Sequence, residues 1–169
     1  EIITEQMISN ENNISSHIIS SENLRNLPEF LWGPIINNSS SLMQKIFKKS
    51  DLLENIAEVQ ATSTASEADE FSNYINDKKG IPIINTGTID RYVTKYGITS
   101  LKNKGTSYKK PLLDITKINK NRAVLYQNPK IIIAKLGLKI EGFFDQDGKF
   151  ASINTNCIHS PHTKNDLYY

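Results

Sequence analysis

The sequence predicts an α+β fold in which an antiparallel β-meander is accompanied by a few short helices. Two observations support this prediction. An apolar run, an alternating segment and a hairpin-turn signal mark three strands over residues 129–158, and apolar residues recur at helical spacing over residues 42–49. With 169 residues, 38% of them hydrophobic, the chain is long enough to bury a core.

The N-terminal part of the chain predicts short elements. Residues 1–20 alternate loosely between apolar and polar, which fits either a strand or a linker. The serines of residues 39–41 can cap a helix over residues 42–49. Residues 50–57 then form a second short helix or a turn, because their apolar side chains keep helical spacing.

The middle of the chain predicts one strand between polar loops. Residues 60–70 are small and polar, and residues 101–110 are polar and basic, so both are expected to be loops. Residues 81–84 predict a short buried strand that is opened by a proline. Residues 85–88 predict the turn that follows it.

The C-terminal third predicts the meander. Residues 129–137 are the clearest strand in the chain, and residues 138–144 and 150–158 predict two more. Asp147 and Gly148 are a strong signal for a hairpin turn between the last two strands.

Charge is distributed unevenly along the chain, although the net charge is only +2. Residues 1–77 carry 12 acids and 4 bases, whereas residues 91–139 carry 12 bases and one acid, Asp114. So many cations in one compact region repel one another unless a polyanion neutralises them, and nucleic acid is the commonest such partner. The alternative is a solvated lysine-rich surface that is balanced by the acidic N-terminal part.

No catalytic or metal-binding motif is found in the sequence. It contains no glycine-rich phosphate loop, no GxGxxG after a strand and no GxSxG. His159 and His162 are expected in a solvated turn rather than in a metal site.

Cys157 is the single cysteine, so it is expected to be a buried apolar side chain in a protein of the reducing cytoplasm. The N-terminal segment lacks the basic residues of a signal peptide, and no apolar run is long enough to span a membrane. These absences favour a binding module.

Three segments, in their order and spacing, resemble the TaqI-like C-terminal specificity domain, the target-recognition domain of type IIG-like restriction–modification adenine methyltransferases. They are Ile81–Tyr92 (IPIINTGTIDRY), Pro129–Gly137 (PKIIIAKLG) and Ile140–Gly148 (IEGFFDQDG) with residues 151–156 after it. The resemblance covers about residues 50–169. The family often has an arginine near the end of the second segment, where this chain has Lys135.

The resemblance implies a division of the chain. Residues 50–169 are expected to be a DNA target-recognition domain that is truncated at its C-terminus. Residues 1–49 are expected to be a connector from an upstream methyltransferase domain of the same chain. The chain begins at Glu1 and ends on an apolar run, so we expect a fragment of a longer polypeptide. The methyltransferase motif itself is not in this sequence.

The resemblance also implies a mechanism and a partner. The parent enzyme would transfer a methyl group from S-adenosylmethionine to a flipped adenine, and the same kind of domain also occurs in related phage-defence methyltransferases. The present domain would hold double-stranded DNA and read its bases, with no cofactor of its own. The side chains expected to face the groove of the DNA are Thr86, Thr88, Asp90, Arg91 and Tyr92.

Arg91 would pair with guanine and Asp90 with cytosine, although these two residues could instead cap a turn and pair with each other. Phosphate contacts position a protein on DNA without reading sequence. The basic residues expected to make them are Lys95, Lys102, Lys104, Lys109, Lys110, Lys120, Arg122, Lys130 and Lys135. The spacing of Lys130 and Lys135 along their strand leaves open that one of them is structural.

Three other hypotheses stay open. Half of a type I restriction specificity subunit would have long helical spacers on both sides. A nuclease domain would need an acidic pair followed by Glu-x-Lys, and no convincing set is found. A protein-interaction domain would use the basic face to bind an acidic partner.

Overall fold

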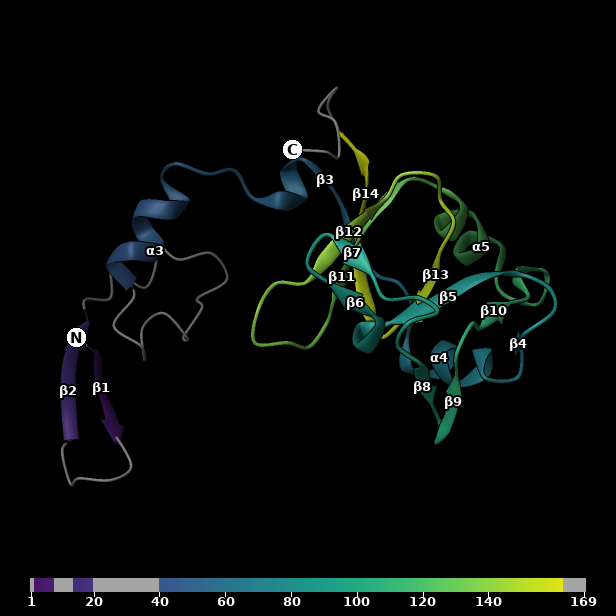
Figure 1. The fold of residues 1–169 in the computed structure, drawn as a ribbon. Helices are drawn as coiled ribbons and strands as arrows, with labels where there is room; N and C mark the ends of the chain where they lie inside the picture. The colour runs from purple at the N-terminus through teal and green to yellow at the C-terminus, as the bar shows by residue number, and fades with distance from the viewer. Residues whose placement is uncertain (1, 8–13, 20–39, 163–169) are drawn as a thin grey trace. The chain divides into compact units, whose positions relative to one another are not determined.

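The computed structural model describes residues 2–7, 14–19 and 40–162. The chain divides into two compact units, residues 1–52 and residues 53–169, and Figure 1 draws both. The predicted boundary lies three residues earlier, between residues 49 and 50. The apolar C-terminal end of the sequence lies outside the described residues.

The first unit contains an antiparallel hairpin and one helix. Strands β1 (Ile2–Met7) and β2 (Ile14–Ile19) pair with Ile2 opposite Ile19, so the loose alternation of residues 1–20 is that of strands. Helix α3 (Ser40–Phe47) confirms the predicted helix and begins within the serine run. Its Leu42 is 59% exposed and Ile46 is 45% exposed.

The second unit contains two four-stranded sheets, which confirms the α+β class. The first sheet has the order β13 (Ala151–Ile153), β5 (Ile81–Asn85), β10 (Leu112–Leu113) and β4 (Ile75–Asn76), and β13 runs parallel to β5. The second sheet is antiparallel throughout and has the order β12 (Gly142–Asp145), β11 (Lys130–Ala134), β14 (Thr155–Pro161) and β3 (Ala57–Ala61).

Strand β5 joins the two halves of the core, because successive side chains of a strand point to opposite faces. Ile83 packs into the cluster around Phe71 and Tyr126, whereas Ile84 packs with Ile132 and Phe143 of the second sheet. The proline-opened strand predicted at residues 81–84 is therefore confirmed as a central buried strand.

The predicted meander is wrong in one connection. Asp147 and Gly148 do form a turn, and Gly148 has φ +60°, but β13 after the turn does not pair with β12 before it. The chain instead crosses to the first sheet, where β13 pairs with β5, and it returns to the second sheet as β14. Long-range pairing therefore overrides the hairpin signal.

Two predicted loops contain regular structure. Residues 60–70 include helix α4 (Ala65–Phe71), which begins with a reciprocal capping box between Thr64 and Glu67. Residues 101–110 contain the hairpin of β8 (Leu101–Asn103) and β9 (Thr106–Tyr108). The polar composition of the two segments hid the helix and the hairpin, because the residues that cap the helix and form the hairpin turn are themselves polar.

Short elements complete the second unit. Two further strands, β6 (Ile89–Asp90) and β7 (Val93–Thr94), form a hairpin, and one further helix is α5 (Lys120–Gln127). The 3-10 turns are η2 (Leu53–Asn55), η3 (Thr86–Thr88) and η4 (Ile115–Lys117). Over residues 2–7, 14–19 and 40–162, no helix has the length and apolar character needed to cross a membrane.

Candidate nucleic-acid interface

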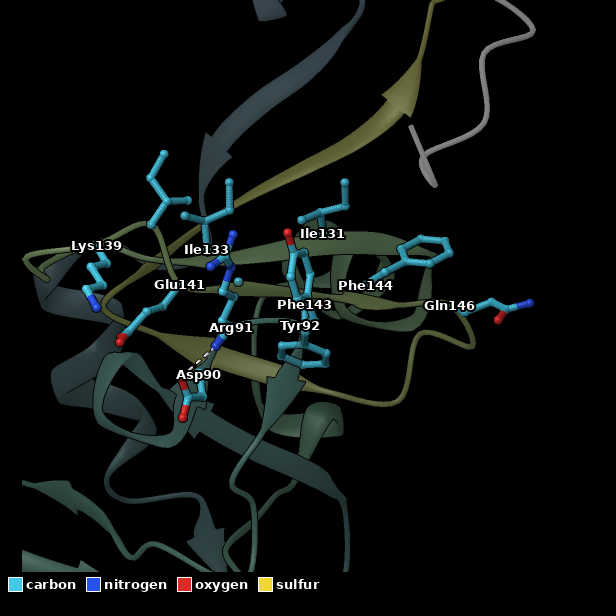
Figure 2. A pocket seen from close by; sticks show the side chains of 12 residues that line it. Asp90, Arg91, Tyr92, Ile131, Ile133, Lys139, Glu141, Phe143, Phe144 and Gln146 are labelled. Atoms are coloured by element: carbon cyan, nitrogen blue, oxygen red, sulfur yellow. Dashed lines mark hydrogen bonds between the residues drawn. The ribbon is translucent and has the colours of Figure 1, made fainter.

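A groove lies between the turn of the β6–β7 hairpin and the outer face of β11 and β12. Figure 2 shows its lining side chains, several of which were not singled out by sequence. The residues that line it are Asp90, Arg91, Tyr92, Ile131, Ile133, Lys139, Ile140, Glu141, Gly142, Phe143, Phe144 and Gln146. Polar and charged groups therefore stand at the edges of an apolar surface.

The turn of the β6–β7 hairpin consists of Arg91 and Tyr92. The backbone N–H of Tyr92 donates to the carbonyl oxygen of Gly142 at 2.8 Å, which ties the turn to β12. Tyr92 has φ +64° and is 80% exposed, although glycine or asparagine is favoured in this left-handed region. Tyr92 thus combines a backbone conformation that disfavours a bulky side chain with an aromatic ring that is exposed to solvent.

The guanidinium of Arg91 lies over the ring of Tyr92, 5.3 Å from its centroid. This cation–π contact restricts the arginine side chain without removing its charge. Arg91 is exposed, and no ion pair joins its guanidinium to another residue of the described chain. The guanidinium therefore stands at the rim of the groove, without an ion pair among the residues that the structure describes.

Asp90 is already partnered within the protein. Its Oδ2 lies 2.5 Å from Nζ of Lys95, and its Oδ1 accepts from the backbone N–H of Arg91 at 2.7 Å (Figure 2). The hydrogen bond to Lys95, followed by that from Arg91, holds the pKa of Asp90 below its usual value, and Asp90 raises the pKa of Lys95. Asp90 thus caps the turn, as one of the two interpretations expected, but its carboxylate pairs with Lys95 rather than with the Arg91 guanidinium.

The floor of the groove is the outer face of the second sheet. Ile131 lies opposite Phe144 and Ile133 lies opposite Gly142, whereas the intervening Ile132 and Phe143 face the core. In Figure 2, Ile131, Ile133 and Phe144 point to the side of the sheet on which Arg91 and Tyr92 stand. The charged groups at the rim therefore lie beside an apolar surface, where polar interactions are less weakened by water.

Thr88 is corrected from a base-facing residue to a structural one. It is 1% exposed, and its hydroxyl accepts from the backbone N–H of Asn85 and donates to the carbonyl of the same residue. Thr86 is half-buried, and its hydroxyl donates to the Asn154 carbonyl and accepts from the backbone N–H of Lys135. The Thr88 hydroxyl therefore closes the turn after β5, and the Thr86 hydroxyl ties this turn to Asn154 and Lys135.

Lys130 is corrected from a phosphate contact to a buried ion pair. Its side chain is fully buried, and Nζ lies 2.6 Å from Oδ2 of Asp145 and 2.6 Å from the carbonyl oxygen of Tyr126. Burial lowers the pKa of Lys130, and the Asp145 carboxylate opposes this effect. Of the two lysines on this strand, Lys130 is therefore the structural one, and Lys135 is exposed.

Arg122 is also corrected to a structural role. It forms a two-point contact with Glu67, at 3.3 and 3.0 Å, and its Nη1 donates to the Ala61 carbonyl at 2.7 Å. These contacts join α5 to α4 and to the end of β3. Three of the five N–H donors of the guanidinium are thus used within the fold, and its charge is paired with Glu67.

The remaining predicted lysines are exposed, and only one of them has an ion pair within the described chain. Lys104 lies 3.5 Å from Asp69 of α4. The elements that carry the exposed lysines lie at different edges of the second unit: β8–β9 at the bottom of Figure 1, α5 at the right, and the β11–β12 connection at the left. The expectation that the basic residues gather in one compact region is therefore wrong for these elements. These exposed lysines are Lys102, Lys104, Lys109, Lys110, Lys120 and Lys135.

No protein-family model matches this chain, and no curated protein matches it. The site must therefore be judged on its own geometry.

No group of three or more potential metal ligands is gathered within residues 2–7, 14–19 and 40–162. The solvated turn expected around His159 is wrong. His159 is 8% exposed within β14, and its ring nitrogens lie 2.7 Å from Nε2 of Gln60 and 2.9 Å from Oγ of Ser160. Its neighbours on β3 and β14 therefore hold the ring in place.

Sequence reasoning missed the apolar part of the site. Phe144 and Ile140 line the groove, and Leu136 and Leu138 are exposed beside it. The signal was present in the sequence, because the second strand was predicted to begin at residue 138 and instead begins at Gly142. Leu138 and Ile140 were expected to lie in this strand and to be buried on one of its faces, but they lie in the loop before it and are exposed.

Proposed function

We propose that residues 53–169 form a double-stranded DNA recognition module of a restriction–modification adenine methyltransferase, and that it positions the target adenine for a separate methyltransferase domain. The observation that carries the proposal is the Arg91 guanidinium, which stands exposed and without an ion pair in the described chain at the rim of the groove. Arginine pairs with O6 and N7 of guanine through two parallel hydrogen bonds. The ring of Tyr92 supports this by restricting the side chain before the DNA arrives.

Phosphate contacts would set the register of the domain on the duplex. Lys102, Lys109 and Lys110 are exposed on or after the β8–β9 hairpin, and they have no ion pair within the described residues. Each lysine that neutralises a phosphate releases condensed counterions, so this part of the binding weakens as salt rises. Lys130, which is buried, and Arg122, which is paired with Glu67, have no part in it.

The chemistry would belong to another domain of the same polypeptide. That domain would hold S-adenosylmethionine and the flipped adenine, because a base must leave the stack before an enzyme can act on it. The present module needs no cofactor for recognition. We place the protein in the cytoplasm, where chromosomal and phage DNA would meet it and where its single buried thiol stays reduced.

A second candidate is a protein-interaction domain. The apolar floor formed by Ile131, Ile133 and Phe144 favours it, because exposed apolar surface beside polar residues is typical of protein contacts. Under this alternative, the groove would bind an apolar protein segment, and duplex DNA would not compete for it.

Fluorescence anisotropy with a pool of labelled duplexes, followed by selection of the bound sequences, tests the DNA proposal. We expect affinity to fall steeply between about 50 and 200 mM salt. Replacement of Arg91 by alanine should lower affinity for the preferred site by about 1–3 kcal/mol and relax preference at one base pair. Equal losses on all sequences would assign Arg91 to the backbone of the DNA.

A triple variant tests the phosphate contacts. Replacement of Lys102, Lys109 and Lys110 by alanine should weaken binding to all sequences alike and reduce the salt slope by about 0.9 for each phosphate that is no longer neutralised. The matched control replaces the exposed Lys45 and Lys48–Lys49 of the first unit and removes the same charge. Equal effects of the two triple variants would show that only net charge matters.

A further inference from the structure

The connection between β11 and β12 presents three aliphatic side chains to solvent. Leu136 is 79% exposed, Ile140 is 85% exposed, and Leu138 is fully exposed. A single exposed aliphatic residue is ordinary on a protein surface, but a contiguous set at the tip of one loop marks a contact site. The recognition of bases by Arg91 does not use this loop.

The loop is held firmly at its base. The backbone N–H of Ala134 donates to the carbonyl of Glu141 at 2.9 Å, and the backbone N–H of Lys135 donates to Thr86 Oγ1 at 3.2 Å. A Cβ added at Gly137 would lie 3.2 Å from the carbonyl oxygen of Lys139, so the turn is tight. The two leucines are therefore exposed on a loop that is anchored at its base, which would let them enter a base step as a wedge.

Cations flank the aliphatic residues. Lys135 and Lys139 are exposed on the same loop, and Arg91 stands across the groove from it. The segment also holds one acid, Glu141, so residues 135–141 carry a net charge of +1. The loop thus alternates apolar side chains with charged ones and stays positive overall.

We propose that this loop is an apolar wedge that inserts Leu136 or Leu138 between stacked base pairs, while Lys135 and Lys139 bind the phosphates on either side. The proposal rests on the proposed function, which it deepens. Apolar side chains that enter a base step unstack it and bend the duplex, and flanking cations hold the backbone of the DNA in place. A protein partner explains the loop less well, because lysine is depleted from the centre of protein interfaces.

Duplexes of a bound site that carry 2-aminopurine at successive positions provide the test, because the fluorescence of this base rises when it unstacks. The full chain should raise the fluorescence severalfold at one step and leave the other steps unchanged. The double variant Leu136→Ala, Leu138→Ala should abolish this rise and lower affinity about tenfold, with the salt slope unchanged because the lysines that neutralise phosphates are all still present. Both side chains are exposed, so the variant is expected to fold.

The control is Val124→Ala on α5, which also removes an exposed aliphatic side chain, 56% exposed, and should change nothing. If the chain binds a preferred duplex but no position unstacks, or if the double variant still unstacks it, the wedge is refuted and the recognition function stands. If the chain binds no duplex, both proposals fail. Binding to an apolar protein segment or to anionic vesicles through Leu136 and Leu138, with duplex stacking unchanged, also overturns the wedge.

Discussion

The ammonium of Lys130 lies 2.6 Å from Oδ2 of Asp145 across paired strands, and both side chains are almost completely removed from solvent. Asp145 also accepts the backbone N–H groups of Lys149 and Phe150, at 2.9 and 3.0 Å. The ion pair therefore connects β11 to the turn that leads the chain into the other sheet. Its contribution is to the stability of the fold.

Replacement of Lys130 by methionine should lower the free energy of unfolding by about 3–5 kcal/mol, because the Asp145 carboxylate would be left buried without its cation. Urea unfolding followed by circular dichroism measures the change. The control is Lys149→Met, whose ion pair with Asp147 is more than half exposed and screened by solvent, so its loss should change the free energy of unfolding very little. Similar losses in the two variants would contradict the argument.

The thiol of Cys157 should resist modification in the folded protein. The side chain is fully buried between the sheets, and burial raises the pKa of the thiol to about 11. Because the thiolate is the reactive form, a disulfide reagent at about pH 8 should label the native chain far more slowly than the urea-unfolded chain. As the sole cysteine, Cys157 then reports opening of the core, and fast labelling without urea would show that the site opens locally.

The sequence was most informative where the local pattern and the long-range structure agree. The strand at residues 81–85 and the strand at residues 130–134 were predicted from apolar runs, and both are central strands of their sheets. The crossing of the chain from β12 to β13 could not be predicted from local signals, because a turn at Asp147–Gly148 is compatible with either destination. The chain goes to the first sheet because β13 pairs with β5, and this long-range pairing is not visible in the local sequence.

The candidate site was predicted in part. The exposed Arg91–Tyr92 turn came from the segment that was singled out, but a count of basic residues treated Lys130, Arg122 and Lys102 as equivalent. They differ because two of them are satisfied by acids far away in sequence, Asp145 and Glu67, and one is not. Charge density along a sequence therefore overestimates the cations that a ligand can use.

The ion pair of Glu67 with Arg122 should make stability depend on pH in the acid range. Burial opposes the shift, but the hydrogen bond from Thr64 and the contacts with Arg122 hold the pKa of Glu67 below its ordinary value of 4.5. The folded state therefore binds this proton less readily than the unfolded state. The contribution is complete above the unfolded pKa and is lost as the pH falls through the lower folded pKa.

The variant Glu67→Gln should thus lose stability at neutral pH and show a flatter fall between about pH 6 and pH 3 than the natural chain. Urea unfolding at a series of pH values measures this. Glu54→Gln is the control, since Glu54 is exposed in η2 and has no ion pair within the described residues. If both variants follow the natural pH profile, the Glu67–Arg122 contact does not contribute to acid stability.

Replacement of Tyr92 by glycine should affect stability and binding in opposite directions. The residue has φ +64°, where a side chain other than glycine costs about 1 kcal/mol, and its exposed ring buries little surface. The free energy of unfolding should therefore stay level or rise by up to about 1 kcal/mol. Affinity for a preferred duplex should fall severalfold, because Arg91 loses the aromatic ring that restricts its side chain.

The variants Tyr92→Asn and Tyr92→Phe separate the two effects. Asparagine also tolerates the left-handed region, so it should match glycine in stability and in reduced affinity. Phenylalanine keeps the ring and the contact with Arg91, so it should bind DNA as the natural chain does. If glycine instead destabilises the fold while DNA affinity is unchanged, Tyr92 supports the β6–β7 turn and the aromatic ring has no ligand.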